Sequence, residues 1–175
     1  MIDARFVPYD DATHRDQFFE MNLEYLSWID DIVSERHGIR VNPGGSVREY
    51  LESVFPKMAA ITPPEGIIYI IEVEGEAAGM GVLRRIEENV GEIKRMYNRP
   101  KIRGNGYGKE MLMRLEDMAL ELGFSTLRLD TGDFMEAAQH IYRKAGFVEI
   151  GKYSGGEWVD RNDTDDVALY MEKKL

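Results

Sequence analysis

The spacing of apolar residues along the chain predicts that helices and strands alternate. Apolar side chains recur at helical spacing in four segments, 12–36, 47–60, 106–122 and 134–145. Ser46 and Glu49 form a capping-box pattern at the start of the second segment, and Asp133 is a predicted N-cap for the fourth. Short apolar runs bounded by Gly, Pro or Asp predict strands at 4–10, 67–75, 76–88, 91–98, 125–131, 146–153 and 166–175. This order predicts a mixed α/β fold with one central sheet.

Composition narrows the class of protein. A chain of 175 residues favours a single domain over residues 1–175. It has no cysteine, which excludes disulfides, thiolate metal sites and a cysteine nucleophile, and which fits a reducing cytoplasm. The first ten residues lack the apolar stretch of a signal peptide, and the longest apolar run, 67–71, is too short to span a bilayer. Since a net charge of −10 also argues against general nucleic-acid binding, we expect a cytoplasmic protein that binds neither nucleic acid nor membrane.

Basic residues gather around a glycine-rich loop. Residues 91–114 contain seven basic residues and two acidic ones, in a chain that is otherwise acidic. Gly104, Gly106 and Gly108 lie in this island, next to the start of a predicted helix. The first turn of a helix has unpaired backbone N–H groups, and glycine lacks the Cβ atom that would block a ligand. The loop is therefore suited to a polyanion, although a flexible turn in a solvated patch is the alternative.

Two common nucleotide-binding motifs do not fit this loop. A P-loop would need glycine where Arg103 stands, and Ser or Thr where Glu110 stands. A Rossmann fingerprint needs the spacing G-x-G-x-x-G in a parallel βαβ unit, whereas the spacing here is G-x-G-x-G after antiparallel strands. The pattern that fits is Arg/Gln-x-x-Gly-x-Gly/Ala, formed by Arg103, Gly106 and Gly108.

This loop resembles the acetyl-CoA loop of the GCN5-related N-acetyltransferase (GNAT) superfamily. The stretch 91–100 looks like the fourth strand of that superfamily and its exit. The segment 137–147 is similar to a later superfamily pattern, A-x-x-x-Y-x-x-x-G-F, through Ala138, Tyr142, Gly146 and Phe147. The similarity covers about residues 66–153, and the first 65 residues match only in the order of their elements.

The resemblance implies a GNAT-like α/β fold, with a mixed, mostly antiparallel central sheet flanked by helices and with central strands splayed apart around a thioester. It implies acetyl-CoA as co-substrate, its diphosphate on the loop and its pantetheine arm along the fourth strand. The implied cofactor-binding residues are Met96, Tyr97, Asn98, Arg103, Gly104, Asn105, Gly106, Tyr107, Gly108 and Lys109. Met135 is a departure, because members often carry Asn or Gln there against the pantetheine.

Two residues are candidates for proton transfer between an amine and the thioester. Tyr142 suits a general acid toward the departing thiolate, because an ordinary tyrosine has a pKa of about 10. The helical pattern places it at the edge of a predicted buried face that includes Ala137. By the resemblance, Glu92 is the candidate base, although an ordinary pKa of about 4.3 requires burial or a water relay. A core-edge tyrosine and a solvated glutamate are the simpler interpretations. The three histidines do not form a metal cluster, so no metal is expected.

The acceptor is expected against residues 20–45 and 153–165, whose acids and aromatic rings suit an ammonium group. The residues singled out are Glu20, Glu24, Tyr25, Trp28, Asp30, Asp31, Tyr153, Glu157, Trp158, Asp160, Asp163 and Asp165. A core Trp28 with solvated acids is the alternative. We expect an N-acetyltransferase that moves an acetyl group from acetyl-CoA to a primary amine of a small molecule or peptide by direct attack. A catalytically silent acetyl-CoA sensor and a protein-interaction module remain as rival functions, and a homodimer stays open.

Overall fold

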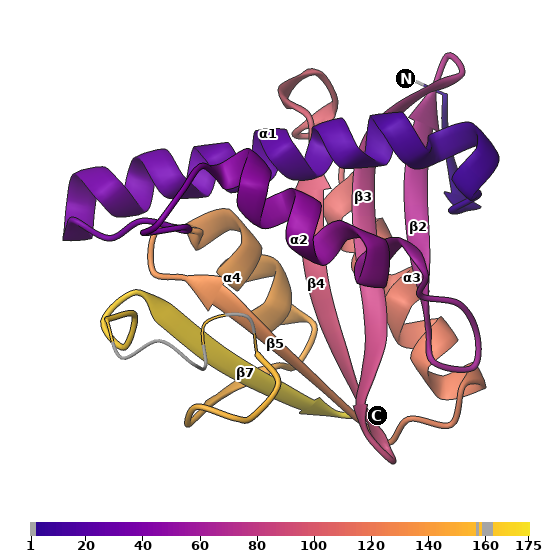
Figure 1. Cartoon of the computed structure of the whole chain (residues 1–175). Helices are drawn as coiled ribbons and strands as arrows, with labels where there is room; N and C mark the ends of the chain where they lie inside the picture. The colour runs from indigo at the N-terminus through magenta and orange to yellow at the C-terminus, as the bar shows by residue number, and fades with distance from the viewer. Residues whose placement is uncertain (1–2, 157, 159–162) are drawn as a thin grey trace.

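The fold is taken from a computed structural model, which describes residues 3–156, 158 and 163–175 (Figure 1). The elements in chain order are β1 (Ala4–Pro8), α1 (Asp11–His37), α2 (Val47–Ala59), β2 (Gly66–Val73), β3 (Glu76–Glu87), β4 (Val90–Asn98), the 3-10 helix η1 (Pro100–Ile102), α3 (Tyr107–Glu121), β5 (Thr126–Gly132), α4 (Glu136–Lys144), β6 (Val148–Ile150) and β7 (Ala168–Lys174). No helix among these residues is long and apolar enough to cross a membrane.

The strands form one seven-stranded sheet in the order β1-β2-β3-β4-β5-β7-β6. Every neighbouring pair is antiparallel except β4 and β5, which run parallel. This pair is joined only at its start, where residues 90–92 face residues 126–128. Beyond Glu92 the two strands separate, and Figure 1 shows them meeting near one end and diverging toward α1. The expected mixed, mostly antiparallel fold with splayed central strands is confirmed.

Helices cover both faces of the sheet (Figure 1). On one face, α1 and α2 bury Phe18, Leu51 and Phe55 against β2 and β3. On the other face, α3 buries Met111 and Leu115 together with residues of β4, β5 and α4. Complete burial of such a side chain contributes about 1.5–3 kcal/mol. Because β2 is covered on both sides, its sequence is a nearly continuous apolar run rather than an alternating one.

A bulge in β4 changes which way its side chains point. Met80 faces Tyr97 and Val82 faces Lys94, so two residues of β4 lie opposite the single residue Gly81. Arg95, the first of the two, has a left-handed φ of 55°. A side chain at Gly81 would come within 2.7 Å of Met111, so glycine is needed for α3 to pack here.

The bulge interrupts the alternation of side chains along β4. Ile93 packs into the core beneath α3, whereas the Arg95 guanidinium lies over the ring of Tyr25 in α1. Met96 then packs into the core on the α3 side, and Tyr97 into the core on the α1 side. Lys94 and Arg95 are therefore consecutive residues that both face the α1 side of the gap.

Some boundaries and caps differ from the sequence predictions. The capping box of α2 is confirmed, because Ser46 and Glu49 bond each other's backbone N–H groups. The predicted cap at Asp133 is wrong, since α4 begins at Glu136 and its N-cap, Met135, makes no side-chain cap bond. Ala137, predicted to be buried, is exposed. The strand predicted at 146–153 shortens to three residues, β6.

Candidate active site

The loop between β4 and α3 presents open backbone at the start of a helix. Gly104 and Gly106 adopt left-handed conformations, with φ of 81° and 82°, and nothing lies within 4 Å of a Cβ built at either position. Within the described residues, the backbone N–H groups of Gly104, Gly106 and Lys109 donate no hydrogen bond to the protein. Other residues would be strained at these φ values, and their side chains would enter the open space. The loop therefore offers both donors and room for a phosphate group.

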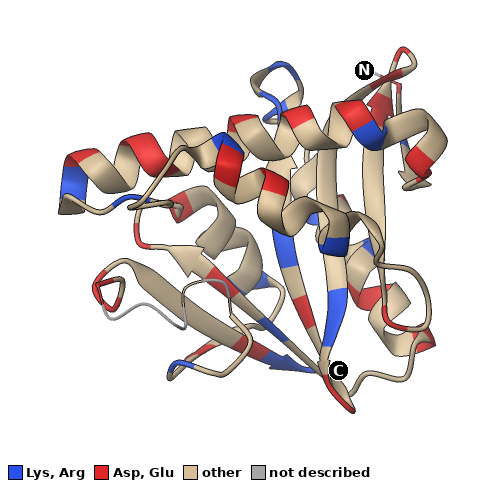
Figure 2. Ribbon diagram, viewed as in Figure 1, with Lys and Arg blue, Asp and Glu red and all other residues tan. Residues whose placement is uncertain are grey.

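Two cations of this loop are available to a polyanion. The loop lies at the top of Figure 2, where its Lys and Arg residues stand out in blue. Arg99 pairs with Glu24 over 2.7 Å, and Lys101 lies 3.4 Å from Glu76. Arg103 and Lys109 form no ion pair with any carboxylate in the described part of the chain. Arg103 is instead held along the loop, where its Nε donates to the carbonyl oxygen of Asn98 over 2.9 Å.

The gap between β4 and β5 continues from this loop into the molecule. Residues 93–98 have no ladder partner on β5, so one edge of β4 is left for an extended ligand to pair with, as an added strand would. Met96 lines this gap, and its Sδ lies 3.8 Å from the Tyr142 hydroxyl. The Tyr97 side chain faces α1 instead and donates to Glu24 over 3.3 Å. Tyr107 packs into the core beneath α3.

Tyr142 lies in the wall of this gap rather than at the edge of a helix face. Its side chain is only 6% exposed and packs in the core cluster of α3, near the ring of Phe147. Burial raises the pKa of the Tyr142 hydroxyl well above its usual value, and the negative charge of Asp130 adds to the rise. The phenol therefore keeps its proton throughout the neutral range.

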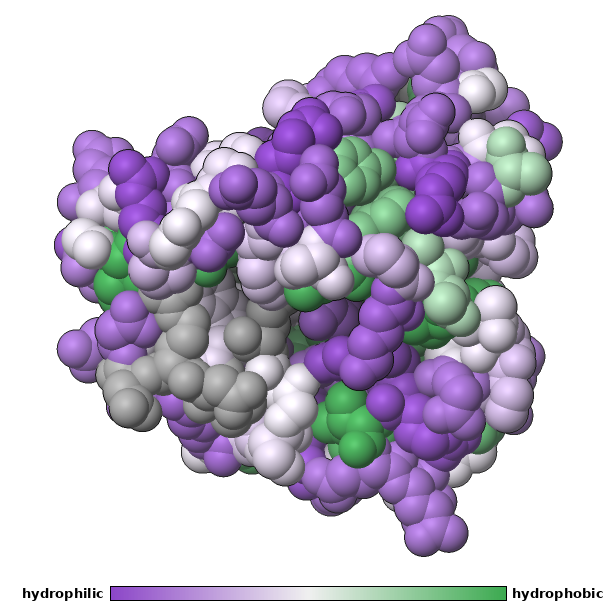
Figure 3. All heavy atoms as spheres, viewed as in Figure 1, coloured by the Kyte–Doolittle hydropathy of each residue, from purple (hydrophilic) through white to green (hydrophobic). Residues whose placement is uncertain are grey.

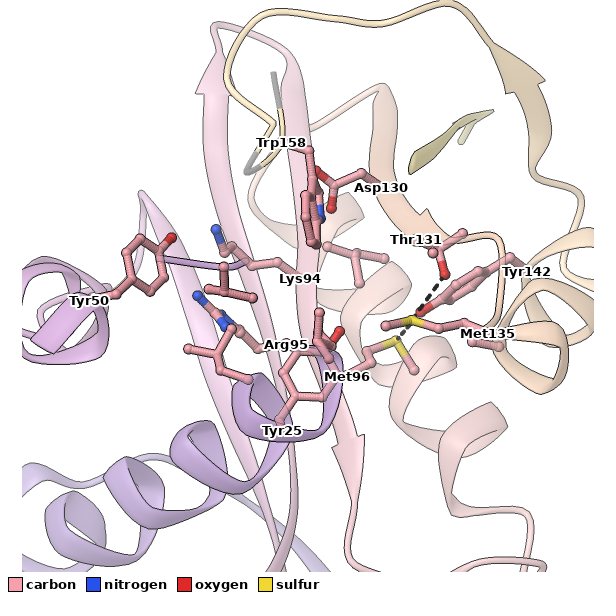
Figure 4. Close-up of a pocket in the computed structure, with 16 residues that line it drawn as sticks. Tyr25, Tyr50, Lys94, Arg95, Met96, Asp130, Thr131, Met135, Tyr142 and Trp158 are labelled. Atoms are coloured by element: carbon pink, nitrogen blue, oxygen red, sulfur yellow. Dashed lines mark hydrogen bonds between the residues drawn. The ribbon is translucent and has the colours of Figure 1, made fainter. Parts of the chain in front are cut away.

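A pocket opens from the gap toward α1 and α2 (Figure 4). Its cavity has a volume of about 100 Å³, and in the space-filling view this face is hollowed beside the residues drawn in grey (Figure 3). Lys94 and Arg95 lie on one side in Figure 4, and Asp130, Thr131 and Tyr142 on the other. The residues that line it are Tyr25, Leu26, Ile29, Val41, Tyr50, Ile93, Lys94, Arg95, Met96, Asp130, Thr131, Gly132, Met135, Ala138, Tyr142 and Trp158.

Glu92 is buried beside this pocket but does not line it. It is 1% exposed and lies at the last paired position of β4, where β4 and β5 begin to separate. Arg84 donates from Nε to one carboxylate oxygen over 2.6 Å, and the Tyr153 hydroxyl donates to the other over 3.1 Å. The structure therefore brings Tyr142 to the pocket and keeps Glu92 behind it, bound to two partners.

The acids predicted for the acceptor side are mostly engaged elsewhere. Glu24 pairs with Arg99, and Asp30 pairs with Arg40 over 2.7 Å while accepting from the backbone of Val41. Trp28 is 38% exposed, so it is neither core nor pocket wall. Tyr25 and Trp158 do line the pocket. The predicted acceptor residues Glu157 and Asp160 lie outside the described residues.

Sequence reasoning missed the pocket's charged residues on β4 and β5. Lys94 and Arg95 were part of the basic island, but an alternating strand pattern gives no sign of the bulge that turns both toward one side. Asp130 is the fifth residue of β5 and faces the separated strand. Its place in an ordinary strand sequence carries no motif, so only the splay of the sheet brings it to the pocket.

The residues present fit acetyl-CoA, which is a long thioester with a diphosphate near its nucleotide end. The open loop offers the donors for the diphosphate, and the free edge of β4 offers backbone partners for an extended arm. The side chain of Met135 also lies in the pocket wall, where its Sδ accepts from Thr131 over 3.4 Å. A polar amide contact at that position is therefore absent, as the sequence indicates.

Comparisons of the sequence and the structure with known proteins agree with the features of this site. Residues 18–147 match the model of the "Acetyltransferase (GNAT) family". An IAA acetyltransferase of Azospirillum brasilense is 31% identical over 134 residues, which cover 72% of this chain and 84% of that one. A Staphylococcus aureus acetyltransferase of the GNAT family has a TM-score of 0.71 at 17% identity, over 99% of both chains.

A second structural neighbour contains the cofactor. This Bacillus anthracis protein, solved in complex with acetyl coenzyme A, is 28% identical, with a TM-score of 0.57 over 70% of this chain and 69% of that one. The family match spans well over half of the chain, and it agrees with the splayed sheet and the open glycine loop. The chain therefore belongs to the GNAT family of acetyl-CoA-dependent N-acetyltransferases.

Proposed function

We propose that the protein acetylates a primary amine by direct attack on the thioester, with Tyr142 as the proton donor. Acetyl-CoA supplies an activated acetyl group whose departing thiolate gains from a nearby acid. The observation that carries this role is the position of the Tyr142 hydroxyl, buried in the gap wall and already directed at a sulfur atom, Met96 Sδ. With no cysteine in the sequence, transfer through a cysteine acyl-enzyme is excluded.

We assign the diphosphate of acetyl-CoA to the loop residues 103–109 and its extended arm to β4 at residues 96–98. The unbonded N–H groups of Gly104, Gly106 and Lys109 support the first assignment, and the missing ladder beyond Glu92 supports the second. Arg103 and Lys109 add positive charge that favours a polyanion without fixing its orientation. In this arrangement the thioester end of the ligand reaches the part of the gap that holds Tyr142.

Glu92 completes the proposal as an indirect proton acceptor. An amine is an ammonium ion at neutral pH and has to lose a proton before it attacks. Because the Glu92 carboxylate does not line the pocket, the proton has to pass through an intervening group. The Tyr153 hydroxyl bonds Glu92 and packs against Trp158, which lines the pocket, but Tyr153 does not line the pocket itself. The proposed relay therefore runs from the amine through a water molecule to Tyr153 and from there to Glu92.

The role of Tyr142 is tested by the variant Tyr142→Phe. We expect turnover, measured as CoA release in the presence of an accepted amine, to fall by roughly 10- to 10,000-fold because the proton donor is lost. The affinity for CoA, measured by calorimetry, should stay within a few fold, since the ring remains. Tyr69→Phe, which removes a hydroxyl on β2 outside the pocket, serves as the control and should leave turnover unchanged. Wild-type turnover in Tyr142→Phe would refute the donor role.

A further inference from the structure

We infer that Arg84 is a positioning residue for the acceptor side of the site, because its guanidinium holds both the Glu92 carboxylate and the chain segment that leads to Trp158. Arg84 does not line the pocket, so it acts through these two groups. The inference rests on the proposed function, since it takes the pocket beside the gap as the place where the amine binds.

Arg84 joins two parts of the molecule that are far apart in the sequence. It lies on β3 directly opposite Glu92 of β4. Its Nε donates to the Glu92 carboxylate over 2.6 Å, and its Nη2 donates to the carbonyl oxygen of Gly155 over 2.6 Å. A planar guanidinium presents such donors in a fixed geometry, which the single ammonium group of a lysine does not reproduce. Arg84 therefore fixes the backbone at Gly155 to the strand pair β3–β4.

Glu92 holds the same segment at a second point. Its other carboxylate oxygen accepts from the Tyr153 hydroxyl over 3.1 Å. Tyr153 is 7% exposed, and its ring packs edge-on against Tyr170 of β7, with 5.6 Å between the ring centroids. Burial raises the pKa of the Tyr153 hydroxyl, and the charge of Glu92 adds to the rise, so the phenol keeps the proton that this bond requires. One chain of bonds thus runs from Arg84 through Glu92 to Tyr153.

The segment held in this way reaches the wall of the pocket. A Cβ atom built at Gly156 would lie 3.1 Å from Oδ2 of Asp130, so the backbone passes close to β5 directly after its bond to Arg84. Trp158 comes next among the described residues, and its side chain packs in the cluster of Tyr153 and lines the pocket (Figure 4). The bonds of Arg84 therefore set the place of one aromatic wall.

A fixed wall matters for binding because an acceptor that meets it does not have to order it. Ordering a chain segment or a side chain on binding reduces affinity. Without the bond from Arg84 to Gly155, the segment before Trp158 would lose one of its two attachments. Acetyl-CoA should be little affected, since its proposed residues on β4 lie opposite Gly79 and Met80 rather than Arg84.

The variant Arg84→Lys tests this role, because it keeps a positive charge beside Glu92 but replaces the fork of donors by one ammonium group. In a Trp28→Phe background, the half-buried Trp158 is the only tryptophan, so its fluorescence reports on the pocket wall. We expect Arg84→Lys to shift this emission to longer wavelength and to increase its quenching by acrylamide. With an accepted amine, KM for the amine should rise roughly tenfold, the equivalent of one lost hydrogen bond, while KM for acetyl-CoA stays within a few fold.

Arg85→Lys is the matched control for this measurement. Arg85 is the next residue of β3, and its guanidinium also donates to two backbone carbonyl groups, those of Pro64 and Glu88, but outside the pocket. It should leave the Trp158 emission and the KM for the amine at their wild-type values. An Arg84→Lys variant that changes neither value, or that raises KM for acetyl-CoA as much as KM for the amine, would overturn the inference and leave the proposed function standing.

The fluorescence comparison needs no substrate, so it separates the inference from the proposed function. Absence of CoA release from the wild-type enzyme with any amine would refute the proposed function, whereas the Trp158 emission would still decide whether Arg84 places the wall. If Arg84→Lys fails to fold, the double variant Arg84→Met/Glu92→Gln leaves no buried charge unpaired at this position and is compared with Glu92→Gln alone. Equal quenching of Trp158 in these two proteins would overturn the inference, and stronger quenching in the double variant would support it.

Discussion

At the scale of single residues, the sequence predicted Tyr142 as a candidate acid but did not predict its surroundings. The motif around it and the helical spacing placed it at the edge of a buried face, whereas it is buried at the gap between β4 and β5. That burial depends on how far β5 diverges from β4. The separation of two strands is a feature of the tertiary structure, and the spacing of apolar residues along one helix cannot predict it. The consequence is chemical, because the buried phenol keeps its proton over a wider pH range than an exposed one.

An alkaline titration of the tyrosines tests this environment. Burial raises the pKa of Tyr142, so the folded state favours the protonated phenol; the resulting stability is present below about pH 10 and is lost as pH rises through the folded-state pKa. Burial likewise raises the pKa of Tyr170 to about 12. By phenolate absorbance of the folded protein, we expect Tyr142→Phe to remove one proton that titrates well above pH 10. Loss of a proton that titrates near pH 10 would contradict the burial of this hydroxyl.

At the scale of elements, the order of helices and strands was predictable because apolar periodicity records which faces are covered. The capping box of α2 was predictable for the same local reason, since Ser46 and Glu49 act within one helical turn. The bulge in β4 was not, because it depends on Gly81 of the neighbouring strand and on the packing of α3 against it. The charge of the pocket depends on this bulge, so it could not be predicted from the sequence.

The glycine loop is the element whose function a single substitution tests most cleanly. Gly106→Ala should weaken CoA binding, measured by calorimetry, more than tenfold, because a Cβ would enter the space assigned to a charged hydrogen-bond acceptor. Gly123→Ala is the matched control, since Gly123 follows α3 with φ of 80° and equally open surroundings. Both variants should lose about 1–2 kcal/mol of stability to backbone strain. Equal CoA affinity in the two variants would place the diphosphate elsewhere.

At the scale of the whole molecule, the fold persists while the sequence diverges. The Staphylococcus aureus neighbour shares the architecture over 99% of both chains at 17% identity, because the layers require only a pattern of apolar positions. The pocket beside the gap is different, because it draws residues from α1, α2, β4, β5, α4 and the segment before β7. No local stretch of sequence encodes such a pocket, which is why the family could be predicted from the sequence and most of the residues that line the pocket could not.

Hydrogen exchange with and without CoA tests most directly whether the ligand occupies the gap between β4 and β5. Both segments concerned contain backbone N–H groups that lack a partner or lie along an unpaired edge, so a bound ligand should slow their exchange. We expect saturating CoA to protect amides of residues 93–98 and 104–109 and to leave β1 and α2 unchanged. Unchanged exchange in both segments, with protection elsewhere in a protein that binds CoA, would contradict this placement.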